Sequence, residues 1–305
     1  MNYSSQKKFN VVTSFLARDF FTREIPSRLP TITEYCEVFN VSRGVVQDAL
    51  ANLEKSGCIE LHKHGSRGSF LVGRKQQQLY DYTMWDVITG TMPAPLDVSL
   101  QGLATGLCNN MSNCDIPFSF AFILGAQRRA KSLSCGLYDF SIVSAMSARY
   151  FIKKWPKLKV IASLHPSVYS YSPYYLIMNH PGITELQDGM RVLYDPYCYD
   201  ETLLTQQVCR EKKVELIEDT ITGARELFER GVVDAMVFRQ DSWMDAIPDI
   251  SIVPLDGQDG STEPILLANQ ENYCIDKLLT SVFMPKEIAD IQREVKNDQR
   301  KARFF

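Results

Sequence analysis

Basic and amide side chains gather near the start of the chain in a pattern that suits nucleic-acid binding. Arg43 and Gln47 fall on the polar face of an expected helix, and the segment HKHGSRG at 62–68 places basic residues around two glycines. Such cations neutralise phosphates, and a glutamine amide can bond to an adenine edge. We therefore expect double-stranded DNA as a partner. The alternative is that Arg43 is solvated and that 62–68 is only a hairpin turn whose glycines supply a positive φ.

A second group of residues, far along the chain, suits the binding of a small anion. An expected strand at 191–194 leads into a helix that begins near Asp200, and backbone N–H groups at a helix start hold carboxylate or phosphoryl groups. Arg239 follows another expected strand, and its planar guanidinium matches a carboxylate or phosphonate. Two alternatives stay open. In the first, Asp200 only caps the helix, and in the second, Arg239 forms a salt bridge with Asp241 or another acid.

The element that positions Arg43 is an amphipathic helix at about 42–56. Its apolar residues recur every three or four positions, Ser42 can cap its first turn, and Gly57 suits the left-handed residue after its last turn. From 59 to 72, apolar residues alternate with polar ones around KHGSRG. This change of period predicts a two-stranded wing after the helix.

Two further helices are expected before this one. Apolar residues at helical spacing predict a helix at 9–21 and another at 32–39, which Thr31 or Thr33 can cap. Between them, the prolines of REIPSRLP at 23–30 predict a loop. Three helices followed by a hairpin make a winged helix-turn-helix.

The segment 25–72 resembles the DNA-binding domain of the GntR family of bacterial regulators. The matching residues are Leu29, Pro30, Val41 to Arg43, Ala49, Leu50, Leu53, Glu54, Gly57 and Gly68 to Val72. The resemblance implies that Arg43 contacts phosphate or base and that the tip at 65–68 lies near the minor groove. Many relatives carry arginine where this chain has Thr33 and Gln47, so we expect weaker phosphate binding. The expected DNA-contacting residues are Pro30, Thr31, Ser42, Arg43, Gln47, Lys63, His64, Gly65, Arg67 and Gly68.

Charge and length agree with a basic DNA-binding domain attached to a larger acidic part. The chain has 305 residues and 45% hydrophobic content, enough for two or three domains. Residues 1–75 hold 11 Lys and Arg against 7 Asp and Glu, a net charge of +4, whereas the remainder carries −7. No apolar run approaches the roughly 18–20 residues of a membrane span, and the first residues lack a signal peptide's apolar core. We expect a cytoplasmic protein with no membrane partner.

The sequence gives little support to catalysis. Eight cysteines without CxxC pairs predict reduced, mostly buried thiols, and His62, His64, His165 and His180 are not spaced as metal ligands. We find no nucleophile elbow, P-loop, HExxH motif or GxGxxG after a strand. We therefore expect neither an enzyme nor a cofactor or metal.

Residues beyond 80 predict an α/β domain, because short apolar runs alternate with helices of about ten residues. Such alternation is typical of mostly parallel sheets. Late strands at 251–254 and 264–267 indicate that the chain returns to an earlier sheet. Two helices are expected within 275–295, and the first would close the first lobe.

One recurrence suggests two similar halves. The segments 133–144 and 227–238 share a scheme of helix end, glycine, two residues, aspartate and buried strand. Residues beyond such strands line the ligand crevice of open α/β sheets. This pattern resembles the two lobes of type II periplasmic binding proteins, which implies a small molecule bound between the lobes. A GntR-like winged helix joined to such a domain is similar, over the whole chain, to the YhfZ family of enterobacterial proteins regarded as regulators.

These resemblances complete the expected organisation. We predict a winged helix-turn-helix at 1–73, a linker at 74–80, and a two-lobed α/β domain at 81–305 whose second lobe spans about 165–245. The expected ligand-binding residues are Gly125, Ser144, Ala145, Ser147, Tyr171, Tyr199, Asp200 and Arg239. The tyrosines near 169–175 would line the cleft or, alternatively, pack the hinge.

The function that follows is a DNA-binding transcriptional regulator, acting as a homodimer, whose second domain binds a small metabolite. An anionic metabolite is expected if Arg239 points into the cleft. The alternative is a small-molecule-binding protein or enzyme whose winged helix mediates protein contact.

Overall fold

We analysed a computed structural model of the full chain. It describes residues 3–114, 116–164, 174–239, 247, 249–255 and 262–304. The chain divides into two compact units. The first contains Met1–Ile88, Asp115–Phe118 and Glu271–Ser281, and the second contains Thr89–Cys114, Ser119–Gln270 and Val282–Phe305.

Three helices form the body of the first unit. They are α1 (Tyr3–Thr22), α2 (Ile32–Phe39) and α3 (Arg43–Lys55). Helix α2 begins with a capping box in which Thr31 and Glu34 bond reciprocally to each other's backbone. Helix α3 buries Val46, Ala49 and Leu53 at helical spacing, and Gly57 has the positive φ of 73° expected after its last turn.

The wing follows α3 as predicted, with one added strand. Strands β2 (Ile59–Lys63) and β3 (Ser69–Arg74) pair antiparallel, and a single 3-10 turn, η1 (Gly65–Arg67), forms the tip. The short strand β1 (Ser27–Arg28), which lies in the predicted proline loop, pairs with β3 on the other side. The observed order of helices and strands is that of a winged helix-turn-helix.

The predicted linker at 74–80 is structured. Arg74 ends β3, and α4 (Gln76–Tyr80) buries Leu79 completely. The polar composition of RKQQQ suggested little to bury, but the apolar residues that follow it supply the buried side.

A segment from near the end of the chain belongs to the first unit. It includes most of α10 (Ile275–Val282), whereas the sequence predicts that this helix closes the first lobe. The ring of Tyr273 packs against Phe15 of α1 and Phe39 of α2, with ring centroids 5.1 and 5.5 Å apart. Lys277 Nζ lies 3.2 Å from Asp19 Oδ1, a carboxylate that is 1% exposed. The winged helix is therefore built on residues from both ends of the sequence.

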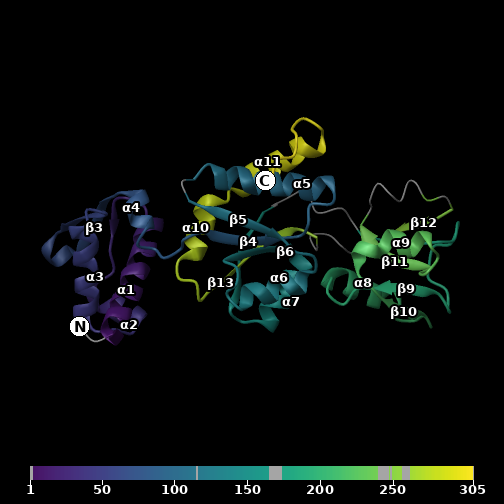
Figure 1. The fold of residues 1–305 in the computed structure, drawn as a ribbon, viewed down its shortest axis with the longest axis horizontal. Coiled ribbons are helices and arrows are strands. Elements are labelled where there is room, and N and C mark those ends of the chain that lie inside the picture. Colours follow the sequence, from purple (N-terminus) through teal and green to yellow (C-terminus); the bar gives the residue numbers. More distant parts are fainter. Residues whose placement is uncertain are drawn as a thin grey trace. The chain divides into compact units, whose positions relative to one another are not determined.

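The second unit contains two five-stranded sheets, which we call the first and second lobes (Figure 1). The first lobe has strand order β5-β4-β6-β13-β7. Its strands are β4 (Ile88–Met92), β5 (Phe118–Phe122), β6 (Phe140–Ser144), β7 (Leu158–Ser163) and β13 (Pro264–Asn269). Strands β4 and β6 are parallel, whereas β13 runs antiparallel to β6 and β7. The predicted return of the late strand β13 to an earlier sheet is confirmed.

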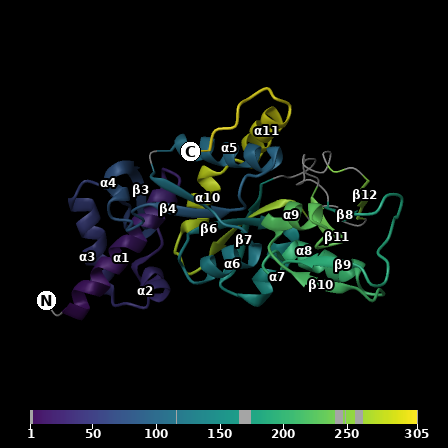
Figure 2. The same cartoon turned by 45° about the vertical axis from the view of Figure 1, so that its right-hand side comes forward.

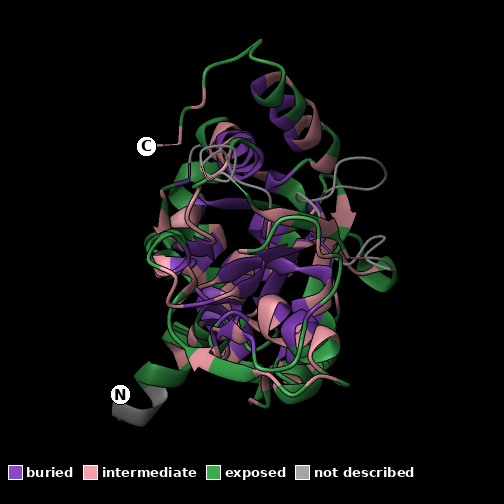
Figure 3. Ribbon diagram, turned by 90° about the vertical axis from the view of Figure 1, so that its right-hand side faces the viewer, coloured by how far each residue is buried: buried purple, intermediate pink, exposed green. Residues whose placement is uncertain are grey.

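Helices cover both faces of the first-lobe sheet, as Figure 1 shows. Helices α6 (Ala126–Ser134) and α7 (Ala145–Lys154) lie on one side, and α5 (Val98–Ser112) and α11 (Pro285–Lys296) lie on the other. Close packing of α5 on α11 requires glycine, because a Cβ at Gly102 would come within 2.9 Å of the Gln292 backbone. Buried residues gather in the strands and on the inner faces of these helices (Figure 3).

The second lobe has strand order β10-β9-β11-β8-β12. Its strands are β8 (Tyr174–Met178), β9 (Arg191–Tyr194), β10 (Glu215–Glu218), β11 (Ala235–Arg239) and β12 (Ser251–Pro254), and its helices are α8 (Tyr199–Val208), η2 (Ile221–Gly223) and α9 (Ala224–Glu229). Strand β9 is parallel to β10 and β11, but β8 is antiparallel to its neighbours β11 and β12. Strand β12 extends this lobe beyond the predicted end at 245. Figure 2 shows α7 and α8 side by side where the two lobes meet.

The recurring glycine-aspartate scheme has the same structural role in both lobes. Asp139 accepts hydrogen bonds from the backbone N–H and hydroxyl of Thr89, at the start of β4. Asp234 accepts from the backbone N–H of Arg191, which begins β9, and pairs with its guanidinium at 2.6 Å. Each aspartate thus fixes the start of a neighbouring strand, which explains the recurrence without a direct role in ligand binding.

The eight cysteines are all free thiols, but only Cys58, Cys198 and Cys274 are buried. The expectation that most would be buried is therefore wrong, because Cys36 and Cys108 lie on partly exposed helix positions and Cys114, Cys135 and Cys209 follow helix ends. Within the described residues, no helix is both long and apolar enough to cross a membrane.

Candidate functional sites

Five of the ten predicted DNA-contacting residues line a groove of about 470 Å³ in the winged helix. The groove lies where β1, the start of α2, the exposed side of α3 and the wing meet. From the predicted set it is lined by Pro30, Thr31, Gln47, Lys63 and Gly68. Arg28, which the sequence did not single out, lines it as well.

Arg43 and Gln47 project from the first turns of α3, and both are exposed. Arg43 Nη1 donates to the hydroxyl of Thr33 on α2 at 3.3 Å, so the guanidinium is held beside the start of the second helix. Ser42 occupies the N-cap position by its backbone conformation, and no capping bond from its hydroxyl is found within the described residues. The predicted capping bond from the Ser42 hydroxyl is therefore not formed, and the residue is exposed.

The wing tip carries the remaining predicted residues. Gly65 and Gly68 have φ values of 56° and 90°, which a residue with a side chain rarely adopts. The ring of His64 packs edge-on against Phe70 at 5.5 Å, whereas Arg67 is exposed. The tip is thus a fixed turn that presents one arginine to solvent.

The second unit contains a cavity of about 110 Å³ between the two lobes. This volume is well above the roughly 10–15 Å³ that one ordered water requires. Gly125, Ser144, Asp200 and Arg239 of the predicted ligand-binding set line the cavity. Its full lining is Pro93, Ala94, Leu96, Asp97, Leu100, Leu124, Gly125, Ala126, Arg129, Ser144, Tyr174, Cys198, Asp200, Glu201, Ile221, Thr222, Phe238 and Arg239.

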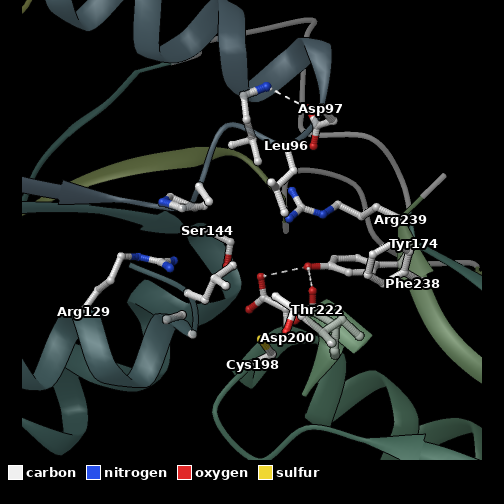
Figure 4. A pocket seen from close by; sticks show the side chains of 18 residues that line it. Leu96, Asp97, Arg129, Ser144, Tyr174, Cys198, Asp200, Thr222, Phe238 and Arg239 are labelled. Carbon is white, nitrogen blue, oxygen red and sulfur yellow. Dashed lines mark hydrogen bonds between the residues drawn. The ribbon is translucent and has the colours of Figure 1, made fainter. Parts of the chain in front are cut away.

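Asp200 is a buried acid of the cavity that bonds to the opposite lobe. It is 7% exposed, and its Oδ1 accepts a hydrogen bond of 2.7 Å from Ser147 Oγ. The hydroxyl of Tyr174 lies 3.5 Å from Oδ2 of Asp200 and 3.2 Å from Oε1 of Glu201 (Figure 4). A phenol carries one proton, so it can donate to only one of these carboxylates at a time.

Burial changes the ionisation of these acids. Loss of solvent raises the pKa of Asp200, although the hydroxyls of Ser144 and Ser147 and the guanidinium of Arg239 act against the rise. Burial also raises the pKa of Glu201, with Arg239 again acting in the opposite direction. The pKa values of both carboxyls are therefore raised, and Arg239 limits the rise.

Two arginines reach the cavity from opposite lobes, as Figure 4 shows. Arg129 of α6 is 5% exposed, and its Nε and Nη1 donate to the backbone carbonyls of Ile142 and Ile123 at 3.2 and 2.7 Å. Arg239 ends β11, and its guanidinium carbon lies 5.8 Å from the centroid of the Tyr174 ring. Sequence reasoning missed Arg129, because nothing in AQRRAKSLS distinguishes the buried arginine from its neighbour.

Three predicted ligand-binding residues lie near the cavity but are not among those that line it. Ala145 and Ser147 are buried in the first turn of α7, where Ser147 is engaged with Asp200. Tyr199 stacks on Tyr150 at 4.3 Å, on the rim between the lobes. Tyr171, with Tyr169 and His165, lies outside the described residues.

The start of α8 differs from the predicted anion site. Cys198 occupies the N-cap position, and Asp200 points to Ser147 instead of capping its own helix. Asp200 and Glu201 place two carboxyl groups in the first turn, where they complement the helix dipole and oppose a bound anion. Helix α6 has the opposite character, because its N-cap Gly125 brings no acid to the cavity.

The lobes touch along one rim of the cavity. The guanidinium carbon of Arg128 lies 4.0 Å from the centroid of the Tyr197 ring, and Tyr150 stacks on Tyr199. Gly125 approaches the same loop so closely that an added Cβ would lie 2.8 Å from the carbonyl oxygen of Tyr197. The cavity and its rim are therefore built from residues of both lobes.

The fold and cavity define a class of protein in which a winged helix-turn-helix precedes a two-lobed periplasmic-binding-protein-like domain. Among solved structures, the periplasmic aliphatic sulphonate binding protein SsuA from Escherichia coli matches with a TM-score of 0.53 at 12% identity, over 70% of this chain and 75% of that one. Residues 25–71 match the model of a helix-turn-helix domain. This match does not distinguish the GntR family, so that finer likeness stays a prediction.

The chain belongs to the YhfZ family, because residues 75–304 match the model of the YhfZ C-terminal domain. It is 27% identical to the uncharacterized protein YhfZ of Escherichia coli (strain K12). The alignment spans 298 residues and covers 96% of this chain and 97% of the relative. The crystal structure of YhfZ from Shigella flexneri matches with a TM-score of 0.61 at 22% identity, over 74% of this chain and 97% of that one.

Proposed function

We propose that the protein is a DNA-binding transcriptional regulator whose two-lobed domain binds a small metabolite. The observation that carries the proposal is the presence, in one chain, of a helix-turn-helix domain with exposed Arg43 and Gln47 and of an interlobe cavity lined by charged residues. The protein acts by binding and not by catalysis, in the cytoplasm, where the chromosome is accessible.

The DNA-binding surface suits major-groove docking of α3. Arg43 and Gln47 leave the first turns of this helix, which are the positions that reach base edges in helix-turn-helix proteins. Arg28, Lys63 and Arg67 flank them on β1 and the wing and provide positive charge for phosphates. Because these cations are few, affinity for a single half-site is low and pairing of two copies in a homodimer provides the rest.

Regulation follows from the geometry of the cavity. A metabolite that contacts both lobes binds their closed arrangement better than an open one and so shifts the population towards it. The effector domain changes the spacing of two winged helices in the dimer, and operator affinity changes with it. The binding energy that the metabolite gains on closure sets the largest possible change.

A gel-shift titration tests this proposal. The probe is DNA from upstream of the protein's own operon, and the competitor is unrelated DNA of equal length, at near-physiological salt because low salt favours non-specific binding. We expect a complex that persists when unrelated DNA is present in excess. Equal affinity for both DNAs, with and without ligand, would overturn the regulator proposal in favour of a winged helix that mediates protein contact.

A further inference from the structure

Charged side chains of both signs line the interlobe cavity. The first lobe contributes Arg129, from α6. The second lobe contributes Asp200 and Glu201, from the first turn of α8, and Arg239 from the end of β11. A ligand between the lobes therefore meets cationic groups and a pair of acids in the same small space.

The cationic part of the cavity is pre-organised. Backbone carbonyls of Ile142 and Ile123 orient the buried Arg129 guanidinium without carrying a full negative charge. Gly125 and Ala126, at the start of α6, line the cavity beside it, and the positive end of a helix dipole favours an anion there. Arg239 enters from the other lobe, so an anionic group can contact guanidinium groups of both lobes (Figure 4).

The acidic part of the cavity is built around one phenol. The Tyr174 hydroxyl lies within 3.5 Å of both Asp200 and Glu201, but its single proton can satisfy only one of them. Tyr174 and Asp200 are 4% and 7% exposed, so water has little access to this end. An ammonium group carries three donors and one positive charge, which allows it to bond to both carboxylates at once.

We propose that the effector is a small zwitterion whose carboxylate, phosphonate or sulfonate lies between Arg129 and Arg239 and whose ammonium group binds Asp200 and Glu201. This inference rests on the proposed function, in which the cavity is the effector site. The ligand closes the lobes because each of its two charges has partners on the second lobe and its anionic group also contacts the first.

The sum of the cavity charges disfavours a simple anion, and the presence of two arginines favours a ligand that also carries a negative group. Five charged side chains line the cavity, and Asp97, Asp200 and Glu201 outnumber Arg129 and Arg239. Asp97 caps α5 by accepting from the Leu100 N–H at 2.7 Å, and it still adds its negative charge to the cavity wall. A simple anion would increase this excess. A simple amine would neutralise it but would bring no negative group for Arg129 and Arg239 to bind.

Matched pairs of small molecules test the assignment with the full-length protein. We would measure thermal stabilisation and then calorimetric affinity for the twenty standard amino acids, β-alanine, 2-aminoethylphosphonate and taurine. Each zwitterion is paired with the same molecule lacking its amino group, such as propionate, ethylphosphonate or ethanesulfonate, and with the amine lacking its acid, such as ethylamine. We expect at least one zwitterion to bind, and to bind at least tenfold more tightly than either of its partners.

Two variants separate the charge assignment from folding. Asp200→Asn and the less buried Glu201→Gln should each weaken the bound zwitterion at least tenfold while leaving the affinity for its deaminated partner unchanged or higher. Glu185→Gln, an exposed acid of the second lobe that pairs with Lys212, is the matched control and should change neither affinity. Retained binding of the deaminated partner shows that a variant is folded.

Two outcomes would overturn the inference in different ways. If deaminated anions or simple amines bind as tightly as the zwitterions, the cavity is an effector site with a different charge preference, and the proposed function stands. If no compound of the three classes binds, the effector-site proposal fails together with the inference.

Discussion

Ser147 Oγ lies 2.7 Å from Asp200 Oδ1, and this buried hydrogen bond joins α7 of the first lobe to α8 of the second. Loss of the hydroxyl leaves a buried carboxyl short of a donor, which costs about 1–3 kcal/mol. Ser147→Ala should therefore lower the urea midpoint of unfolding, as followed by circular dichroism. Ser112→Ala is the control, because its exposed hydroxyl bonds only to the Cys108 carbonyl of its own helix. An equal loss in both variants would mean that the interlobe bond contributes nothing.

Gly125 allows the lobes to approach, and its replacement should weaken ligand binding. An alanine Cβ there would lie 2.8 Å from the Tyr197 carbonyl oxygen, which is backbone and cannot move aside. Gly136→Ala is a close control, since Gly136 also has a positive φ, of 73° against 84°, but has no atom within 4 Å of the added Cβ. Both variants place a side chain at a positive φ, which costs on the order of 1–3 kcal/mol. Only Gly125→Ala should lower ligand affinity, by roughly tenfold, which corresponds to about 1.4 kcal/mol of binding free energy. Calorimetric titration of both variants measures the difference.

The buried acids of the cavity predict a fall in stability as the pH rises. Burial raises the folded-state pKa of Asp200 and Glu201 above their ordinary values of 3.8 and 4.5, despite the facing Arg129 and Arg239 and beside the Tyr174 hydroxyl. The folded protein then binds more protons than the unfolded chain, so the free energy of unfolding falls as pH rises from the ordinary to the raised values. Asp200→Asn should flatten this part of the profile. Urea midpoints of wild type and Asp200→Asn across this window check the sign, and a wild type that gains stability relative to the variant as pH rises would contradict it.

Asp19 should be a principal stabilising residue of the winged helix. Its 1% exposed carboxylate accepts from Arg23, from Lys277 and from the Tyr35 hydroxyl, at 2.7, 3.2 and 3.0 Å. Asp19→Ala leaves these donors without their acceptor and should cost about 1–3 kcal/mol. Lys277→Ala should cost less, about 0–1 kcal/mol, because that side chain is half exposed. Thermal denaturation of the two variants gives the order, and a larger loss in Lys277→Ala would contradict the ranking.

The winged helix was predictable because its signals are local. Helical spacing, Thr31 as a cap, Gly57 after the helix and the change of period at 59 each depend on residues a few positions apart. The added strand β1 was not predictable, since two residues in a proline loop pair with β3 only in the folded structure. For the same reason nothing in the sequence indicated that Lys277 would reach Asp19.

The two-lobed architecture was predictable from short apolar runs, but two of its elements were missed. Strand β4 (ITGTM) contains Gly90 because the ring of Phe140 occupies the space of a side chain, and this weakens the apolar signal. Helix α5 carries Gly102 and Gly106 where α11 packs closely. Its buried residues lie on all sides of the helix, so the sequence shows no single apolar face. In both cases tertiary packing set the residue type.

The candidate ligand site was predictable only in part. Ser144 and Arg239 were expected at the cavity because each ends a strand, and both line it. The role of Asp200 depends on Ser147, 53 positions earlier, and on Tyr174. Such contacts leave no pattern in a single sequence, so the sequence predicts only a helix start whose backbone N–H groups bind an anion.

Energetic coupling between DNA and effector tests the central claim most directly. The measurement is fluorescence anisotropy of labelled operon-upstream DNA, titrated with protein at near-physiological salt, with and without a saturating amount of the zwitterion that gives the largest thermal stabilisation. We predict specific DNA binding whose Kd changes at least fivefold with ligand, and an equal change of ligand affinity when DNA is present. Arg43→Ala should lose about 1–3 kcal/mol of DNA-binding free energy. Its ligand-dependent thermal stabilisation should be unchanged. A DNA affinity that is the same with and without bound ligand would contradict the account.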